Sequence, residues 1–191
     1  MKKEELLDKL RRNTAKQYDM PDMHIEGITY QDVKKQFIET SGIVGSKVVE
    51  LNEGDDINNV IKGLYPDAKV FASNVEGLTI ANRNPDTVAE ANDLNGTDVG
   101  IVEGHMGVAE NGCVWIPQTM KEKAVCFICE YLVIILRKDC LVSNMHEAYS
   151  RLDMTDYGYG VFISGPSKTA DIEQALVMGA QAARGVTVIL V

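Results

Sequence analysis

The sequence has few of the residues from which metal and redox sites are built. Its 191 residues include three histidines and four cysteines. No two histidines have the HxH or HExxH spacing of a zinc site, and the only Cys-x-x-Cys pair, Cys126 and Cys129, lies among apolar neighbours. We therefore predict no metal site. We interpret the cysteines as free thiols in a reducing compartment, with this pair serving as small buried hydrophobes.

Long apolar runs and an excess of positive charge are also missing. The longest apolar run covers residues 131–136, far short of the roughly 20 residues that a membrane span needs. The amino terminus has no apolar signal-peptide core. With 28 acidic and 19 basic residues, the net charge is −9. These features predict a cytoplasmic protein that binds neither nucleic acid nor an anionic membrane.

Three common catalytic or nucleotide-binding signatures do not occur. The sequence has no GxGxxG after a predicted strand, no GxxxxGK[ST] phosphate loop and no GxSxG nucleophile elbow. Dinucleotide binding, phosphate-loop chemistry and serine hydrolysis are therefore not indicated.

The hydrophobic pattern alternates between strands and helices. We predict strands at 46–51, 69–72, 98–102, 131–136, 160–164 and 186–191, and helices at 3–17, 30–41, 55–64, 85–92, 143–152 and 169–183. Residues 107–109 and 113–116 flank Asn111-Gly112, a strong hairpin signal. The alternation predicts an α/β domain with a mostly parallel, mixed sheet between helices. We assign residues 1–42 to a helical segment packed on or beside this domain, and residues 43–191 to the domain itself.

A polar loop follows the predicted strand at 160–164. It runs from Ser164 to Thr169 and leads into the predicted helix at 169–183. Free N–H groups at a helix start favour anions, so the loop is a candidate anion site at a strand's carboxyl end. Ser164, Gly165, Ser167, Lys168 and Thr169 are its candidate ligand-binding residues. The alternative is a capping turn with a solvated Lys168.

A second polar cluster spans residues 98–113. Glu110 is a candidate general base or nucleophile, and His105 is its weaker candidate partner or a hydrogen-bond donor to substrate. Candidate ligand contacts here are Asp98, Gly100, Asn111 and Gly112. The alternative is a hairpin whose polar residues simply face water.

Two motifs resemble the LUD domain family, in particular its short members of the lactate utilization protein C type. The stretch Ile163-Ser-Gly-Pro-Ser-Lys-Thr-Ala-Asp-Ile-Glu173 is similar to the family's C-terminal signature, with Lys168 at a position that is usually Arg. The turn Ala109-Glu-Asn-Gly-Cys113 is similar to the family's Ala-Glu-Thr-Gly-Thr turn. The resemblance covers about residues 75–191.

The resemblance implies a three-layer α/β/α fold like that of the NagB/RpiA/CoA-transferase group. It also implies a role in oxidising L-lactate to pyruvate together with iron–sulfur partner proteins. The chain itself is expected to carry no iron–sulfur cluster, and its cofactor is unknown. A small anionic metabolite is the expected ligand, and homo-oligomerisation is left open.

The chain departs from the family pattern at its expected histidines. Residues 130–132, 181–183 and 186–187 have none. Enzymatic activity is therefore left open, and two alternatives stand beside a lactate-utilization role. One is a small enzyme of CoA-transferase-like fold, acting on an acyl or phosphorylated metabolite through Glu110. The other is a non-catalytic anion- or metabolite-binding regulatory module.

Overall fold

Five parallel strands form the central sheet. The computed structural model describes residues 3–13, 19, 26–152, 158–172 and 175–191. The sheet has the order β1-β11-β6-β3-β2. Its strands are β1 (Ser46–Glu50), β2 (Phe71–Ala72), β3 (Val99–Gly104), β6 (Tyr131–Leu136) and β11 (Gly185–Leu190). Because all five are parallel, their amino ends share one edge of the sheet.

β6 is the middle strand and aligns its two neighbours. Tyr131 is level with Val99 of β3 and with Gly185 of β11. The same register continues without a shift to Leu136. The three strands therefore begin at the same level, and the residues that precede them emerge side by side.

Both faces of the central sheet are buried. Leu132 and Ile134 of β6 pack in one core cluster, whereas Val133 and Ile135 pack in another. Side chains alternate between the faces of a strand, so an unbroken apolar run indicates burial on both sides. The run at 131–136 is therefore a strand with the predicted bounds.

A second sheet carries the predicted hairpin. Its strands are β4 (Met106–Val108), β5 (Cys113–Pro117), β7 (Leu141–Val142) and β8 (Gly160–Ile163), in the order β7-β4-β5-β8. β4 and β5 are antiparallel about the Asn-Gly turn, as predicted. However, the hairpin belongs to this separate sheet rather than making the central sheet mixed.

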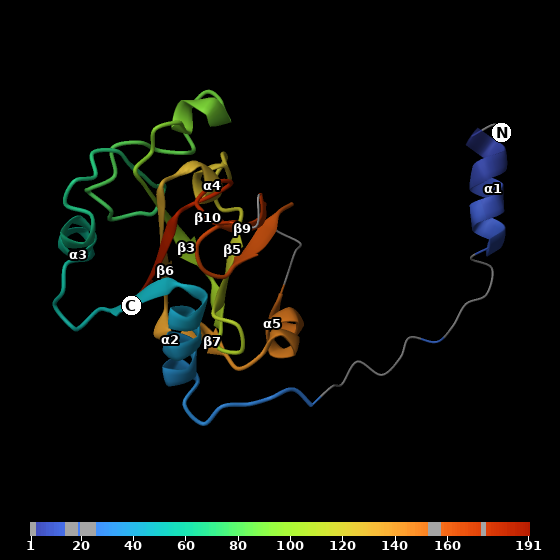
Figure 1. The fold of residues 1–191 in the computed structure, drawn as a ribbon, viewed down its shortest axis with the longest axis horizontal. Coiled ribbons are helices and arrows are strands. Elements are labelled where there is room, and N and C mark those ends of the chain that lie inside the picture. The colour runs from blue at the N-terminus through green and yellow to red at the C-terminus, as the bar shows by residue number, and fades with distance from the viewer. Residues whose placement is uncertain (1–2, 14–18, 20–25, 153–157, 173–174) are drawn as a thin grey trace.

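Helices cover the sheets. α3 (Ile57–Leu64) buries Ile61 on one face of the central sheet, while α2 (Val33–Val44) and α4 (Val125–Ile128) pack in the core on the other. α5 (Met145–Arg151) covers the second sheet through Ala148, on the far side from α3 in Figure 1. This confirms the predicted α/β architecture of a mostly parallel sheet flanked by helices. No helix among the described residues is long and apolar enough to cross a membrane.

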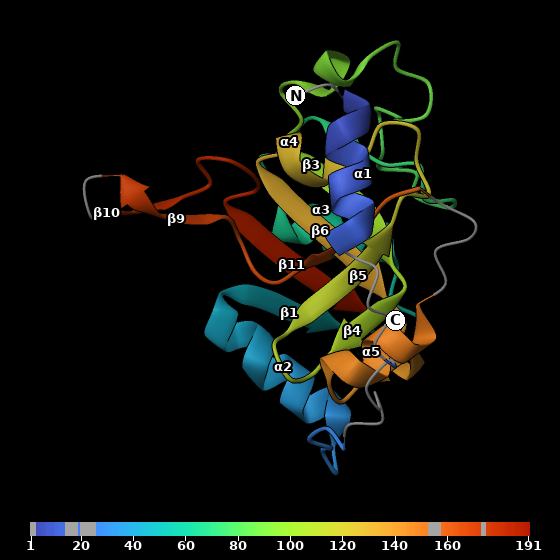
Figure 2. The same ribbon diagram turned by 90° about the vertical axis from the view of Figure 1, so that its right-hand side faces the viewer.

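The predicted helix at 169–183 is wrong. Residues Lys168–Ile172 and Ala175–Met178 form β9 and β10, an antiparallel ribbon that extends away from the sheets (Figure 2). Gly179 has φ 76°, a left-handed conformation at which a right-handed helix cannot continue. The β-branched Thr169 and Val177 face each other across the ribbon and suit extended backbone.

The predicted helix at 85–92 is also wrong, since the segment holds only turns before a 3₁₀ helix, η1 (Ala91–Leu94). The Asn84 side chain accepts a hydrogen bond from the Asp86 N–H at 2.8 Å, and the Asn84 backbone carbonyl accepts one from the Thr87 hydroxyl. Such local bonds compete with a helix start.

α2 spans the predicted boundary between residues 42 and 43. Asp32 caps its amino end by accepting a hydrogen bond from the Lys35 N–H, and Gly45 ends it in a left-handed conformation. Phe37 is fully buried in the main core cluster. By contrast, α1 (Lys3–Asn13) has no buried residue. The division into a helical segment of residues 1–42 and a domain of residues 43–191 stays a prediction.

Replacing Phe37 by Ala should lower the free energy of unfolding by about 3–5 kcal/mol, because it leaves a cavity in the core. The matched control is Ile43→Ala on the same helix, where 82% of the side chain is exposed and the cost should stay within about 0.5 kcal/mol. Chemical denaturation monitored by circular dichroism measures both. Equal effects for the two variants would show that α2 does not pack on the sheet.

Candidate functional site

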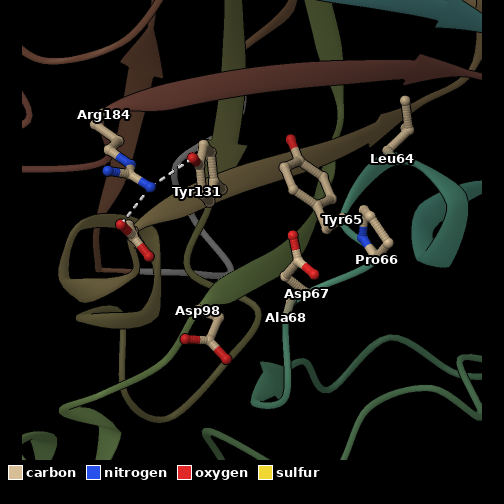
Figure 3. A pocket seen from close by; sticks show the side chains of 9 residues that line it. Leu64, Tyr65, Pro66, Asp67, Ala68, Asp98, Tyr131 and Arg184 are labelled. Atoms are coloured by element: carbon tan, nitrogen blue, oxygen red, sulfur yellow. Dashed lines mark hydrogen bonds and ion pairs between the residues drawn. The ribbon is translucent and has the colours of Figure 1, made fainter.

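A cavity of about 320 Å³ opens where the parallel strands begin, and we call it the edge cavity (Figure 3). It lies beside the amino ends of β2, β3, β6 and β11. Its lining residues are Leu64, Tyr65, Pro66, Asp67, Ala68, Asp98, Glu130, Tyr131 and Arg184. Three carboxylates, two phenols and one guanidinium thus converge on one small space.

The register of β6 explains why residues distant in sequence meet here. Asp98, Glu130 and Arg184 each immediately precede a strand, and those three strands start at the same level. The three charged residues therefore lie in one row along the sheet edge.

Arg184 is held on several sides. Its guanidinium pairs with the Glu130 carboxylate at 2.6 Å and donates to the Tyr131 hydroxyl at 2.6 Å. It also stacks over the Tyr131 ring, 4.8 Å from the centroid. Its backbone N–H donates to the Glu130 carbonyl. About half of each charged side chain is exposed, so the ion pair alone contributes at most about 1 kcal/mol. The guanidinium is therefore oriented by several contacts, of which the ion pair contributes little energy.

Asp98 ties β3 to the segment that enters β2. Its carboxylate accepts hydrogen bonds from the backbone N–H groups of Val70 and Lys69, at 2.8 and 2.7 Å. These two bonds hold the pKa of Asp98 below its ordinary value, because they favour the charged form. The carboxylate is thus negative at neutral pH and already engaged with the backbone.

Tyr65 forms the inner wall of the edge cavity. Its hydroxyl hydrogen-bonds the buried Thr187 hydroxyl at 2.8 Å, and its ring packs against Tyr131 at 5.0 Å. Burial raises the pKa of Tyr65, since it penalises the phenolate. The phenol is therefore neutral, an uncharged wall beside the charged row.

Two further cavities continue from the edge cavity, the middle cavity beside it and the loop cavity beside the middle one. The middle cavity, of about 480 Å³, is lined by Gly96, Thr97, Asp98, Phe127, Ile128, Cys129, Glu130, Met178, Gly179, Ala180, Gln181, Ala182 and Arg184. The loop cavity, of about 430 Å³, is lined by Cys126, Phe127, Leu132, Val161, Phe162, Ile163, Ser164, Gly165, Pro166, Ser167, Lys168, Gln181, Ala182, Ala183 and Val186. Because neighbours share wall residues, Asp98 and the polar loop belong to one continuous row of cavities.

The polar loop at 164–168 clamps the carboxyl end of α2. The Lys168 ammonium donates to the Val44 carbonyl at 2.5 Å, and the Ser164 hydroxyl donates to the Asn111 carbonyl at 2.8 Å. Gly165 has φ 71°, and a Cβ there would lie 2.5 Å from the Val44 carbonyl oxygen. The loop thus connects α2 with the 109–112 turn. Only glycine fits at position 165, where the loop comes closest to α2.

The loop does not occupy the position that the sequence predicts. β8, which it follows, lies in the second sheet, and the Ser167 N–H bonds the Ala183 carbonyl just before β11 begins. The loop is thus near the amino ends of the parallel strands. No helix starts at Thr169, which pairs with Val177 in the β9–β10 ribbon. The physical basis for an anion cradle at a helix start is therefore wrong. Ligand binding by the loop residues stays a prediction.

Glu110 lies outside the three cavities. Its carboxylate accepts a hydrogen bond from the Met145 N–H at 2.9 Å, and its own N–H donates to the Ser143 carbonyl. Met145 is the first residue of α5, so the carboxylate satisfies one N–H group at that helix start. This contact gives Glu110 a structural role, and its catalytic role stays a prediction.

His105 does not lie next to Glu110. The two residues lie beyond opposite ends of β4, His105 immediately before the strand and Glu110 in the turn after it. His105 is exposed beyond the carboxyl end of β3, whereas Asp98 precedes the amino end of that strand. The structure therefore does not assemble these candidates into one catalytic group.

The remaining predicted contacts of the 98–113 cluster pack against neighbouring elements. A Cβ on Gly100 would lie 2.8 Å from the Val125 carbonyl oxygen of α4, and one on Gly112 would lie 3.0 Å from Ser41 of α2. The Asn111 side chain accepts from the Cys113 N–H at 3.1 Å, which closes the hairpin turn. These positions let helices approach the sheets closely.

The cysteine pair is buried, as predicted. Cys126 and Cys129 are each 3% exposed and free, and both pack in the main core cluster. Burial raises the pKa of Cys126 to about 12 and that of Cys129 to about 11. The thiols stay protonated at neutral pH. Within the described ranges, no three His, Cys, Asp or Glu side chains are arranged to hold a metal ion.

Sequence reasoning did not select Glu130, Tyr131 or Arg184 as site residues. Arg184 directly follows the helix predicted at 169–183. Residues 130–132 are notable in the sequence only because they lack the expected histidine. No local motif signals these residues, because strand register alone brings them together.

Comparison with known proteins confirms the family resemblance. The model of the LUD domain matches residues 86–191, more than half of the chain. Lactate utilization protein C of Shouchella clausii (strain KSM-K16) is 36% identical over 88 residues. That match covers 43% of this chain and 38% of the relative's length.

A solved structure has a similar fold. It is the crystal structure of a DUF162 family protein from Deinococcus radiodurans, which superposes with a TM-score of 0.60 at 11% sequence identity. The superposition covers 86% of this chain and 99% of that one. At this low identity the likeness concerns the fold alone.

Gly165→Ala should destabilise the folded protein by about 2 kcal/mol or more, through left-handed strain and a clash with the Val44 carbonyl. Gly158→Ala is the control, because no atom lies within 4 Å of a Cβ placed there. Urea denaturation compares the two. A Gly165 variant as stable as the Gly158 variant would contradict the clamp at α2.

Asp98→Asn should destabilise the fold by about 0.5–1 kcal/mol at pH 7, since it weakens two charge-assisted bonds at a solvent-screened site. Because its pKa is lowered in the folded state, the charged carboxylate stabilises the fold at pH values above 3.8, its ordinary pKa. This contribution disappears as pH falls through the lower pKa of the folded state. Denaturation of both proteins from pH 7 downward should show their stabilities converging in acid. A difference that grows in acid would contradict this assignment.

Proposed function

We propose that this chain, which belongs to the LUD domain family, takes part in lactate utilization. Its role would be that of an accessory component in the oxidation of L-lactate to pyruvate. The observation that carries the proposal is the 36% identity to lactate utilization protein C. The match covers only part of that protein, so the activity of the whole relative is a proposal for this chain. The proposal includes iron–sulfur partner proteins that accept the electron pair.

The position of the cavities supports this proposal. The middle and loop cavities are built wholly from residues 86–191, the region that matches the family. The same region supplies the charged row and Tyr131 to the edge cavity. The segment that carries the family likeness is therefore also the segment that encloses space for a small ligand.

Arg184 is the group best suited to hold the carboxylate of a hydroxy acid in the edge cavity. A guanidinium binds a carboxylate through two parallel N–H bonds. Here it would exchange the half-exposed Glu130 for the ligand. The neighbouring Tyr131 hydroxyl would then be free to contact the ligand hydroxyl. This arrangement binds and orients a hydroxy acid, while the proposal assigns electron transfer to the partners.

The positions without the expected histidines line these cavities. Glu130 and Tyr131 are in the edge cavity, Gln181 and Ala182 are in the middle and loop cavities, and Val186 is in the loop cavity. The departures therefore alter the walls of the proposed site and leave the sheet that carries it intact. They favour a second candidate function, a metabolite-binding module without catalysis. The CoA-transferase-like alternative depends on Glu110, which caps α5 away from the cavities.

Deleting the gene from its own organism should slow growth on L-lactate as sole carbon source, while growth on pyruvate stays normal. The wild-type gene should restore growth, and an Arg184→Ala variant should not. Arg137→Ala is the matched control, because Arg137 also pairs with a carboxylate, that of Asp139, but beyond the carboxyl end of β6.

Normal growth of the deletion strain on L-lactate would overturn the lactate role. If the Arg184 variant restores growth as well as the Arg137 variant does, the edge cavity is not the site. Purified Arg184→Ala protein must first give the wild-type circular dichroism spectrum, so that a loss of function is not a loss of fold.

A further inference from the structure

The loop cavity differs in character from the edge cavity. Most of its lining residues are apolar, and several of them belong to the core or pack against it, including Phe127 of α4, Leu132 of β6 and Val186 of β11. Its polar side chains are those of Ser164, Ser167 and Lys168 on the loop, and of Gln181 outside it. The cavity therefore combines apolar residues with a polar loop.

The charge on this loop is positive. Among the described residues that line the cavity, Lys168 is the only one with a charged side chain. Its ammonium uses one of its three N–H donors on the Val44 carbonyl, which is a neutral partner. The edge cavity, by contrast, has three carboxylates against one guanidinium.

The other lining residues add no opposing charge. Among them is Cys126, and burial raises the pKa of its thiol to about 12, so the thiol stays neutral at physiological pH. A ligand that fills this space thus meets uncharged residues and the Lys168 cation. That pattern matches an anionic head joined to an apolar tail.

We propose that the loop cavity binds an amphipathic monocarboxylate, with its carboxylate beside Lys168 and its hydrocarbon tail against Phe127, Leu132 and Val186. A volume of about 430 Å³ lies within the range of about 300–1,000 Å³ typical of small-molecule sites. It accommodates a tail much longer than the single methyl group of lactate. This site is separate from the edge cavity and does not depend on the lactate role.

Isothermal titration calorimetry of the full chain with octanoate, hexanoate, octanol and L-lactate tests the proposal. Each additional buried methylene should tighten binding about fourfold, so octanoate should bind about 15-fold more tightly than hexanoate. Octanol, which has the same tail but no charge, should bind about fivefold more weakly than octanoate. L-Lactate should not compete with octanoate. Absence of octanoate binding, or affinity independent of chain length, would overturn the proposal.

Two variants with controls locate the site. Lys168→Gln keeps an N–H donor for the Val44 carbonyl but removes the charge, and should weaken octanoate about fivefold while leaving octanol unchanged. Lys138→Gln is the matched control, because Lys138 also donates to a backbone carbonyl, that of Leu51, away from the cavity.

Val161→Phe should fill the cavity and remove the dependence on chain length. Equal losses in the Lys168 and Lys138 variants would place the carboxylate elsewhere, and unchanged octanoate binding in the Val161 variant would place the tail elsewhere. If Lys168→Gln does not fold, the comparison of octanoate with octanol on the wild-type protein still decides the role of charge.

Discussion

The pairing of β6 with β3 on one side and β11 on the other is the constraint on which the rest of the structure depends. Both pairs are parallel and begin at Tyr131, so three strands start level. The side chains of β6 alternate between the two faces of the sheet and pack in a core cluster on each face. The same register places Asp98, Glu130 and Arg184 in one row. Fold and candidate site thus have a common origin in one strand register.

The row of cavities lies where the amino ends of the parallel strands meet the segments packed beside them. The edge cavity is lined by charged residues, and Arg184 is already paired with Glu130 there. The loop cavity is lined mostly by apolar residues and carries the single charge of Lys168. The two cavities differ in chemistry and are separated by the middle cavity. A hydroxy acid suits the first cavity, and a longer carboxylate suits the second.

Local sequence signals predicted the elements whose pattern is visible within one short segment. The apolar run at 131–136 and the Asn111-Gly112 turn each gave the observed strand or hairpin. The helix expected after Lys168 failed, because Gly179 takes a left-handed conformation and the β-branched residues before it pair across a ribbon. The charged row could not be predicted, since its members are up to 86 positions apart and only tertiary register joins them. Glu110, a catalytic candidate from the sequence, caps a helix, and its catalytic role stays a prediction.

The central claim is that small ligands bind along the amino edge of the parallel sheet. Its most direct test is a two-dimensional amide NMR spectrum of ¹⁵N-labelled protein during titration with L-lactate. The account predicts chemical-shift changes at Asp98, Glu130, Tyr131 and Arg184, with little change at the carboxyl edge. Changes concentrated at His105 and Asp139, with none along the row, would contradict it.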